Sequence, residues 1–579
     1  MNKYILLMLA MSTLCACRPP QEREVKLKIV QTSDLHGNYY PYDFIRRTDA
    51  KGSLSRVASY VKEQRNVYGD NLILLENGDI LQGQPTAYYY NFIDTLAPHL
   101  TADMLNYLEF DAGNMGNHDI ETGRSVFDRW SSQCQFPVLG ANIIEVESDE
   151  THCPPYVVLE RDGVKVAVLG MITPAIPVWL SENLWKGLRF DDMEETARKW
   201  VGIIRERENP DLLVGLFHAG KNPQLMADKY WDNASLEVAR KVPGFDVVLI
   251  GHDHTRACMK VANVEGDSVL VLNPASNGLL VSDVEITVRK QGDHLLEKHV
   301  DGKLVETDAY APDADFLARF AEEQETVRSF VSKPIGTFSQ TISTRPAYFG
   351  SSAFVDLIHT LQLEISGAEI SLAAPLSFDA EIRQGEIFVS DMFNLYKYEN
   401  MLYTMSLTGQ EVHDALEMSY ALWTNQMTSP ADHLLLLGQT TKKGGDELAR
   451  FRNPSYNFDS AAGIIYEVDV RKPAGQKVNI ISMADGTPFS LDKTYRVAVN
   501  SYRGNGGGEL LTKGAGIPRE KLTERILSST DKDLRFYLMQ YIEQMKEVHP
   551  KPLNQWKFIP TSWYSAAAKR DSLLIFGEK

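Results

Sequence analysis

One pattern recurs five times in the first half of the chain and constrains its fold more than any other feature. A short apolar run ends, and a loop rich in Gly, Asp, His or Asn follows directly. The runs have the composition and length of buried strands, and helix-like stretches such as residues 54–64 and 193–207 lie between them. Alternating strands and helices predict a layered α/β fold, in which ligands bind beyond the carboxyl ends of the strands.

The five loops carry side chains that can bind metal ions. In chain order they are Asp34-x-His36, Asn77-Gly78-Asp79, Gly116-Asn117-His118-Asp119, His218-Ala219-Gly220 and Gly251-His252-Asp253-His254. Imidazole and carboxylate ligands without thiolates suit Mn, Zn, Fe, Co or Ni. One such pair alone is usually structural, but five loops that each end a strand predict a metal site.

In this order the motifs resemble those of the calcineurin-like metallophosphoesterase family, in which an aspartate bridges two metals. The resemblance implies a metal-dependent hydrolase of phosphoric ester bonds with two divalent metal ions per chain (Mn, Zn, Co, Fe or similar). By motif, the ligands of one metal would be Asp34, His36, Asp79 and His254. Those of the other would be Asp79, Asn117, His218 and His252. Asp79 would be the bridge.

The same resemblance assigns two catalytic residues. His118 follows the ligand Asn117 and corresponds to the family's catalytic histidine, which stabilises phosphoryl charge or protonates the leaving oxygen. A carboxylate three residues further on orients this histidine in the nucleotidases, and Glu121 stands there in place of the more usual Asp or Asn.

The second half of the chain has two Tyr- and Asn-containing turns, at residues 395–400 and 497–508. Such turns, beside glycines, suit stacking on a flat heterocycle. These stretches resemble the C-terminal domain of the 5'-nucleotidase family, which holds a nucleotide base between two aromatic rings. The resemblance implies substrate-binding roles for Tyr398 and Tyr502, and a polar contact to the base from Asn400.

Further stretches include Ser33-Asp34-Leu35-His36, Leu372-Ala373-Ala374-Pro375, Leu416-Glu417-Met418-Ser419 and Tyr456-Asn457-Phe458-Asp459. With them, residues 26–550 more narrowly resemble the 2',3'-cyclic-nucleotide 2'-phosphodiesterase/3'-nucleotidases of that family. A departure concerns the Gly-Gly-x-Arg element with which 5'-nucleotidases anchor their substrate. Here the corresponding stretch is residues 374–379, and Arg383 follows further on. This difference argues against 5'-monophosphates as the main substrate.

Several functions therefore stay open. The resemblance favours a cyclic-nucleotide 2'-phosphodiesterase with 3'-nucleotidase activity in nucleotide catabolism. The alternatives are a 5'-nucleotidase or nucleotide-sugar hydrolase with the same metals, a dimanganese sulfur-oxidation hydrolase that would not need the tyrosines, and a non-catalytic surface lipoprotein that binds nucleotides or a host partner.

The expected organisation is a four-layer α/β/β/α metallophosphoesterase domain, joined by a helix to a C-terminal α/β nucleotide-binding domain. Asp313 can cap that helix, which should run to Val331 and end before Pro334. The expected segments are a signal peptide at 1–17, the first domain at 18–306, the connector at 307–334, the second domain at 335–565 and a tail at 566–579.

The N-terminus predicts export. An apolar run from Tyr4 to Leu14, too short to span a bilayer, precedes Leu14-Cys15-Ala16-Cys17. This sequence resembles a bacterial lipobox, which implies cleavage before Cys17 and lipidation of its thiol. We therefore expect a lipoprotein held in the periplasm at the outer membrane, or at the cell surface, by a lipid anchor only.

The charge balance bears on possible partners. With 59 basic and 77 acidic residues, the net charge of −18 argues against binding to a nucleic-acid polymer, since phosphate contacts need Lys and Arg. A small phosphoester remains compatible, because bound cations dominate the potential of a local site. We expect a monomer.

Of the remaining cysteines, Cys134 and Cys153 would close the shortest disulfide loop, and this pairing stays open.

Overall fold

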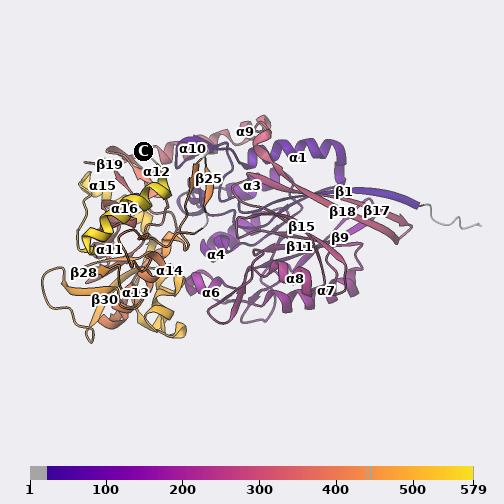
Figure 1. Ribbon diagram of the computed structural model, residues 1–579. Helices are drawn as coiled ribbons and strands as arrows, with labels where there is room; N and C mark the ends of the chain where they lie inside the picture. Colours follow the sequence, from indigo (N-terminus) through magenta and orange to yellow (C-terminus); the bar gives the residue numbers. More distant parts are fainter. Residues whose placement is uncertain (1–21, 439, 444–445, 578–579) are drawn as a thin grey trace, which may run out of the picture.

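The computed structural model describes residues 22–577 except 439 and 444–445, and this part of the chain forms two α/β halves (Figure 1). The predicted signal peptide and Cys17 lie outside the described residues. The first half contains two six-stranded sheets. One has the strand order β18 (His294–Glu306), β17 (Leu280–Gln291), β1 (Glu22–Thr32), β4 (Leu72–Glu76), β5 (Ala112–Asn114), β6 (Val138–Leu139). The other has the order β15 (Arg256–Ala262), β16 (Ser268–Pro274), β14 (Val247–Ile250), β11 (Leu212–His218), β9 (Val164–Ile172), β8 (Tyr156–Arg161).

The two sheets pack against each other through a core of aliphatic side chains, among them Leu27 and Ile29 of β1 and Val166 and Val214 of the second sheet. Helices cover the two outer faces. On one side are α1 (Leu54–Tyr68), α3 (Leu100–Tyr107) and α5 (Arg124–Gln133). On the other are α7 (Met193–Glu208) and α8 (Ser235–Lys241). The predicted four-layer α/β/β/α arrangement is confirmed.

The central strands of both sheets are parallel, so their carboxyl ends point the same way. β1, β4, β5 and β6 pair in parallel in the first sheet, and β9, β11, β14 and β16 do so in the second. Side-chain caps set the start of the helices between them. Ser53 accepts the amide N–H of Arg56 at the start of α1, and Asp192 accepts two N–H groups at the start of α7.

The connector differs from the single helix that the sequence predicts. Asp313 caps the first turn as expected, by accepting the N–H of Phe316. Phe320, however, leaves the helical conformation (φ −112°, ψ 26°) and divides the segment into α9 (Ala314–Arg319) and α10 (Ala321–Val331). The hydroxyl of Tyr40, from the first half, donates to the carbonyl oxygen of Phe320 at 3.0 Å, so a tertiary contact is made at the break.

The second half is built on a five-stranded sheet that helices cover. Its order is β27 (Ser460–Ala462), β21 (Ile370–Ala373), β30 (Thr494–Asn500), β24 (Met401–Thr408), β31 (Ile526–Asp533). The principal helices are α11 (Ala353–Ser366), α12 (Val389–Leu395), α13 (Gly409–Trp423), α15 (Leu534–Met545) and α16 (Thr561–Phe576). This half also contains two three-stranded sheets, in the orders β23 (Gly385–Phe388), β19 (Pro334–Phe338), β32 (Glu547–Val548) and β29 (Val478–Met483), β28 (Ile464–Asp469), β33 (Trp556–Ile559).

The predicted tail at 566–579 is a second difference. As far as residue 577, these residues form most of α16 and the turn that follows it. Ala567 and Ile575 lie in the core of the second half. The fully buried carboxylate of Asp571 accepts the N–H groups of Leu434 and Leu435. The described part of this segment therefore belongs to the second domain.

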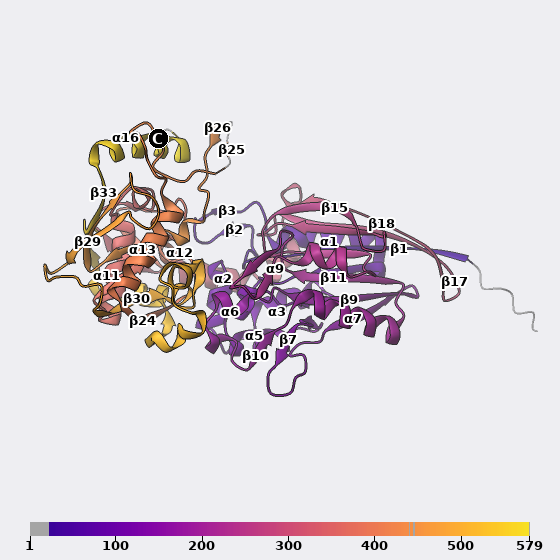
Figure 2. The same cartoon turned by 60° about the horizontal axis from the view of Figure 1, so that its bottom comes forward.

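Within the described part of the chain, hydrogen bonds join the two halves in two regions. On one side, Arg47 Nε lies 2.9 Å from Ser390 Oγ, and the hydroxyl of Tyr88 donates to Asp533 at 3.2 Å. On the other, the hydroxyl of Tyr403 donates to Ser181 Oγ at 2.5 Å. Figure 2 shows α2 (Pro85–Tyr88) and α6 (Ile176–Trp179) of the first half at this boundary.

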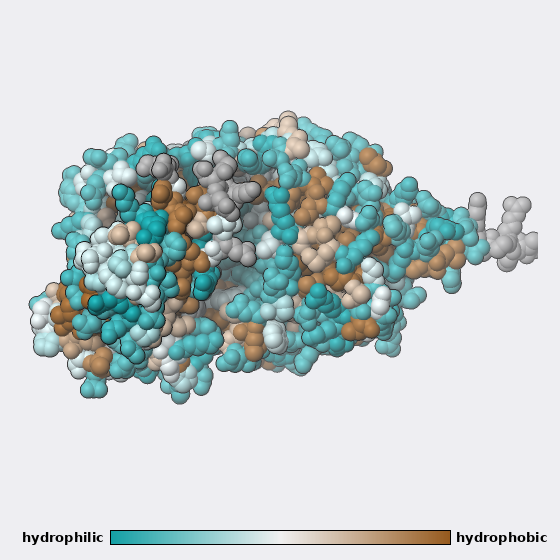
Figure 3. All heavy atoms as spheres, in the orientation of Figure 1, coloured by the Kyte–Doolittle hydropathy of each residue, from teal (hydrophilic) through white to brown (hydrophobic). Residues whose placement is uncertain are grey.

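Further features of the described residues concern their surface, helices and cysteines. The face shown in Figure 3 is largely hydrophilic, with smaller apolar areas in both halves. Among the described residues, no helix is both long and apolar enough to cross a bilayer. Cys134, Cys153 and Cys258 are free thiols, so the structure does not contain the Cys134–Cys153 disulfide.

Candidate functional site at the junction of the two halves

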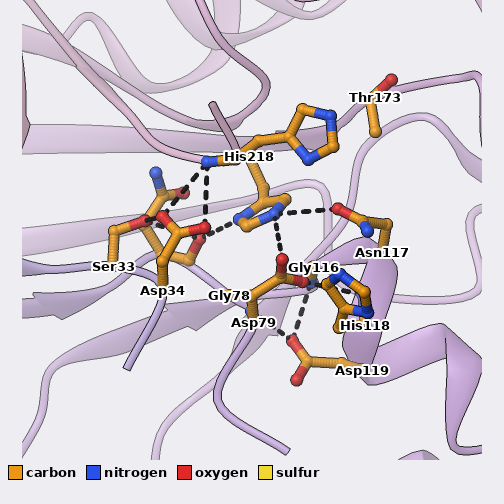
Figure 4. Close-up of polar contacts among 12 residues, drawn as sticks. Ser33, Asp34, Gly78, Asp79, Gly116, Asn117, His118, Asp119, Thr173 and His218 are labelled. Atoms are coloured by element: carbon orange, nitrogen blue, oxygen red, sulfur yellow. Dashed lines mark hydrogen bonds and ion pairs between the residues drawn. The ribbon is translucent and has the colours of Figure 1, made fainter. Parts of the chain in front are cut away.

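The five loops predicted from the sequence meet at one edge of the first half. Asp34 follows β1, Asp79 follows β4, Asn117 follows β5, His218 ends β11, and His252 follows β14. Because the central strands are parallel, their carboxyl ends bring these side chains together. Figure 4 shows Asp34, Asp79, Asn117 and His218 turned toward one another.

The backbone of these loops is in an uncommon conformation. Five of the predicted ligands have φ between 48° and 71°, in the left-handed region: Asp34, His36, Asp79, His252 and His254. Few residues other than glycine adopt this region, and when several do so at one place the surrounding structure holds them there. The loops are therefore shaped to aim particular side chains at a common point.

The side chains form two groups that share one residue. Ligand atoms of Asp34, His36, Asp79 and His254 lie within 4.8 Å of one another, and so do those of Asp79, His218 and His252. Oδ1 of Asn117 lies 3.1 Å from Nε2 of His218, beside the second group. The structure thus brings together all seven predicted ligands, with Asp79 between the two groups.

Two of the histidines are held as metal ligands usually are. Nδ1 of His218 lies 2.6 Å from the carbonyl oxygen of Asn77, and Nδ1 of His36 lies 3.2 Å from that of Gln82. A ring N–H that donates to a carbonyl fixes the tautomer and leaves the lone pair of Nε2 free. Burial lowers the pKa of His36 to about 3, which keeps this imidazole neutral.

Several oxygen and nitrogen atoms that can bind a cation face one another at short range. Oδ2 of Asp79 is buried and has no hydrogen-bond partner among the described residues, although Nε2 of His218 lies 3.1 Å away. Nε2 of His36 and Nε2 of His254 are 3.0 Å apart. A buried oxygen without a donor is costly, and cations bound between these atoms would remove that cost. The residues therefore fit two divalent ions with oxygen and nitrogen ligands.

A carboxylate that the sequence did not reveal supports His252. Oδ1 of Asp232, on β13 (Tyr230–Asp232), lies 3.2 Å from Nε2 of His252. Asp232 is 5% exposed and also accepts the hydroxyl of Thr173 at 2.7 Å. It thereby orients the His252 ring with Nδ1 free. Asp232 lies in an ordinary hairpin sequence 20 residues before His252, so only the fold reveals the pairing.

The predicted catalytic pair lies next to the metal ligands. Asn117, His118 and Glu121 are on the short helix α4 (Asn117–Glu121), and the backbone N–H of His118 donates to Oδ1 of Asp79 at 2.7 Å. Burial alone would lower the pKa of His118, but Asp79 and then Glu121 raise it to about 9. Without bound metal, these carboxylates favour the cationic imidazole, the form that can donate a proton.

Three tyrosines of the second half form a cluster facing this site. Tyr398 and Tyr502 are the two that the sequence predicts. Tyr456, in the short turn Ser455–Asn457, stands between them, with its ring centroid 6.4 Å from that of Tyr398 and 6.1 Å from that of Tyr502. We call these three residues the tyrosine cluster. The carboxylate of Glu121 contributes to raising the pKa of Tyr398, after burial and Tyr456, so the cluster lies within electrostatic reach of the catalytic pair.

Two buried ion pairs hold the segments that carry the tyrosine cluster. Arg503 binds the carboxylate of Asp459 with both Nε (2.8 Å) and Nη2 (2.7 Å), and it also donates to the carbonyl oxygen of Tyr456. Arg535 binds Glu399 at 2.9 Å and donates to the carbonyl oxygens of residues 396 and 397. Both guanidinium groups are almost completely buried. These buried bonds fix the backbone of the segments that carry the aromatic rings.

Asn400 and Arg383 are placed less favourably for contact with a substrate. Asn400 is 7% exposed, and its Oδ1 accepts the hydroxyl of Tyr396 at 3.5 Å, so part of its hydrogen-bonding capacity is used within the fold. The side chain of Arg383 is 87% exposed and pairs with Glu381. The base contact of Asn400 stays a prediction.

Two family models match the chain, one for each half. Residues 27–256 match the calcineurin-like phosphoesterase model, and residues 334–513 match the 5'-nucleotidase C-terminal domain. A trifunctional nucleotide phosphoesterase of Bacillus subtilis is 28% identical over 93% of this chain. A 2',3'-cyclic-nucleotide 2'-phosphodiesterase/3'-nucleotidase of Salmonella typhimurium is 27% identical over 93% of it. The chain spans 39% of the first relative and 89% of the second.

Solved structures show the same architecture. A Staphylococcus aureus protein of the 5'-nucleotidase type, solved with alpha-ketoglutarate, superposes with a TM-score of 0.74 over 92% of this chain and 99% of that one. The two sequences are 21% identical, so this likeness bears on the fold alone.

Proposed function

The chain belongs to the metallophosphoesterases that carry a 5'-nucleotidase C-terminal domain, and we propose that it opens 2',3'-cyclic nucleotides and then dephosphorylates the 3'-nucleotides formed. It is a hydrolase of phosphoric ester bonds. One observation carries the choice of nucleotides as substrates: the second half presents the tyrosine cluster, suited to a flat base, beside the metal ligands and the catalytic pair of the first half.

The residues of the first half divide the chemistry among them. Asp34, His36, Asp79 and His254 would hold one divalent ion, and Asp79, Asn117, His218 and His252 the other. Such a pair of ions, when bound, activates a water molecule and neutralises charge on the phosphoryl oxygens. His118 donates a proton toward the leaving oxygen, and Glu121 holds its ring in the required tautomer.

The proposed reaction has two hydrolytic steps. In the first, water attacks phosphorus, the bond to the 2'-oxygen breaks, and that oxygen takes a proton, which leaves a 3'-phosphate. In the second, another water molecule displaces the 3'-oxygen and releases nucleoside and phosphate. Both leaving groups are ribose hydroxyls of one nucleoside, so one base-binding site serves both steps.

The second half supplies the preference for nucleotides over other phosphoesters. Stacking of a base on aromatic rings contributes about 1–3 kcal/mol per base, and Tyr398 and Tyr502 offer such rings. The 5'-nucleotidases anchor their substrate with the arginine of a Gly-Gly-x-Arg element, which this chain lacks. Arg383 does not replace that arginine, because its side chain is exposed to solvent and paired with Glu381. This difference supports ribose 2'- and 3'-phosphates over 5'-monophosphates as substrates.

A substrate panel on metal-reconstituted protein tests the proposal. We expect 2',3'-cyclic AMP and 3'-AMP to be hydrolysed with higher kcat/KM than 5'-AMP, with 3'-AMP as the transient product of the first. A higher kcat/KM for 5'-AMP would favour a 5'-nucleotidase. Fewer than one metal ion per chain after reconstitution, with no turnover, would favour a non-catalytic binder.

We further propose that the protein is exported and lipidated at Cys17. The motif Leu14-Cys15-Ala16-Cys17 supports this location. Globomycin, which blocks the lipoprotein signal peptidase, should make the precursor accumulate. Processing that is insensitive to the drug would reject the lipid anchor and leave the enzymatic proposal untouched.

A further inference from the structure

Tyr456 occupies a position that neither the sequence nor the metal chemistry explains. Its ring makes angles of 84° with Tyr398 and 87° with Tyr502, at nearly equal centroid separations of 6.4 and 6.1 Å. Because its plane is nearly perpendicular to both, Tyr456 makes an edge-to-face contact with each ring and stacks on neither. It stands across the two rings, as the third side of a slot would.

One face of Tyr502 is already covered. A Cβ at residue 507 would lie 2.5–2.6 Å from three consecutive ring atoms of Tyr502, so the backbone of Gly507 packs directly against that face. Only glycine permits this approach. A flat ligand can therefore stack only on the opposite face.

Hydrogen bonds fix the backbone turn that carries Tyr456. Nη2 of Arg503 donates to its carbonyl oxygen at 3.2 Å, and the neighbouring Asn457 accepts the hydroxyl of Tyr502 at 3.4 Å. Arg503 is itself fixed by Asp459. These bonds join the turn of Tyr456 to the turn of Tyr502, so the two rings keep their relative position.

The polar end of Tyr456 is unpaired within the described part of the chain. Its hydroxyl makes no hydrogen bond to any residue that the structure describes, whereas the hydroxyl of Tyr502 is bonded to Asn457. A half-buried phenol without a partner can both donate and accept. The edges of nucleobases present donors and acceptors that match it.

We propose that Tyr456 is a substrate-contacting residue that closes the slot: its ring packs edge-on against the base, and its hydroxyl bonds a polar atom of the base edge. This inference rests on the proposed nucleotide hydrolysis and adds a residue that determines which bases fit.

Two consequences separate this contact from a structural role. Loss of the hydroxyl should weaken binding of the base without changing the chemical step. Loss of the ring should open the slot to bases with extra bulk at the edge. Phosphoesters without a base should be unaffected in both cases, because the metal ligands and His118 are all in the first half.

The experiment compares Tyr456→Phe and Tyr456→Ala with the parent. The matched control is Tyr541→Ala, which truncates another partly buried tyrosine of the same domain. Metal-loaded protein is assayed with 2',3'-cyclic AMP, its 1,N6-etheno derivative and bis-p-nitrophenyl phosphate, and adenosine binding is measured by calorimetry.

We expect both Tyr456 variants to raise KM and the Kd of adenosine by about two- to tenfold, the range of one hydrogen bond or one aromatic edge contact. We also expect unchanged kcat, unchanged activity on bis-p-nitrophenyl phosphate, and a gain in kcat/KM on the etheno substrate relative to cyclic AMP in Tyr456→Ala.

The outcomes distinguish the possible failures. Unchanged KM and adenosine affinity in both variants would overturn the inference while leaving nucleotide hydrolysis in place. A lower KM in Tyr456→Ala would also overturn it, because Tyr456 would then block the slot rather than line it. If the parent hydrolyses no nucleotide, the proposed function fails, and the adenosine titration still decides whether Tyr456 contacts a base.

Discussion

Nδ1 of His118 lies 2.5 Å from Oε2 of Glu121, one turn further along α4. The side chain of Glu121 is 6% exposed and that of His118 is 25% exposed, so the carboxylate is shielded while the imidazole stays partly accessible. This hydrogen bond places a proton on Nδ1, where it faces the carboxylate of Glu121, and it directs Nε2 outward.

This pair yields a first prediction. His118→Asn should lower kcat by about 10²–10⁴-fold, the usual contribution of one general acid, while the bound metal content stays near that of the parent. Glu121→Gln keeps the size but not the charge, and it should lower kcat less than His118→Asn does. Steady-state kinetics and metal analysis check both. Loss of metal in His118→Asn would show that this histidine is a ligand instead.

The support of His252 by Asp232 yields a second prediction. Asp232→Asn removes the charge that stabilises the ring orientation, and loss of such an outer partner weakens metal binding by about 10–100-fold. Titration of the metal-free protein with Zn²⁺ or Mn²⁺ should show one weakened site of two. Asp301→Asn, at an exposed carboxylate whose pair with Lys260 is on the surface, is the control. Two unweakened sites would leave Asp232 a purely structural residue.

The buried pair Arg503–Asp459 yields a third prediction. Arg503→Met leaves a carboxylate buried without its partner, which costs about 3–5 kcal/mol of unfolding free energy. Urea denaturation measures this loss. In the double variant Arg503→Met, Asp459→Leu, stability should largely return, because a buried pair can be replaced by apolar residues.

The same two variants report on the tyrosine cluster. If Arg503 positions Tyr456 and Tyr502 through its hydrogen bonds, KM for the nucleotide stays raised in the double variant even though stability recovers. A KM that returns to the parent value would mean that Arg503 matters to folding alone.

The buried histidine His359 yields a prediction about pH. Its ring, 0% exposed, contacts the hydroxyls of Ser371 and Ser460, and burial lowers its pKa to about 3. In the unfolded chain a histidine titrates near 6.5. Between these values the unfolded state binds the additional proton, so the free energy of unfolding falls as pH is lowered from about 6.5 toward 3.

The test compares the pH dependence of variants rather than their stability at one pH. His359→Gln can still bond both serines, and between pH 7 and 4 its unfolding free energy should fall less steeply than that of the parent. His549→Gln, at a histidine whose side chain is 69% exposed, should keep the slope of the parent. Equal slopes in all three proteins would contradict the assignment of His359 as a buried neutral group.

The strands and ligand loops of the first half could be predicted because their signals are local. Val25, Leu27 and Ile29 alternate with polar residues, and β1 spans Glu22–Thr32 as that alternation requires. Residues 54–64 likewise predicted α1, which runs to Tyr68. The seven predicted ligands converge because each follows a strand of a parallel sheet, so the topology converts sequence order into spatial proximity.

What could not be predicted depends on contacts between distant residues. The break at Phe320 coincides with a hydrogen bond from Tyr40, 280 residues earlier. Tyr456 lies in a stretch that contributes to the family resemblance, Tyr456-Asn457-Phe458-Asp459, but its role depends on its perpendicular packing on Tyr398 and Tyr502. Asp232 can orient His252 only because a hairpin brings its carboxylate next to that ring. The tail was misjudged because the burial of Asp571 depends on a loop near residue 434.

The separation of the ligands from the tyrosine cluster along the chain has a consequence for how such proteins diversify. Every predicted metal ligand lies between residues 34 and 254, and every member of the tyrosine cluster lies between 398 and 502. Mutations that alter which leaving group is recognised can therefore accumulate without disturbing bond cleavage. Grafting a foreign second half onto this first half, at the connector between α9 and α10, would redirect an unchanged hydrolytic centre to a new class of ester.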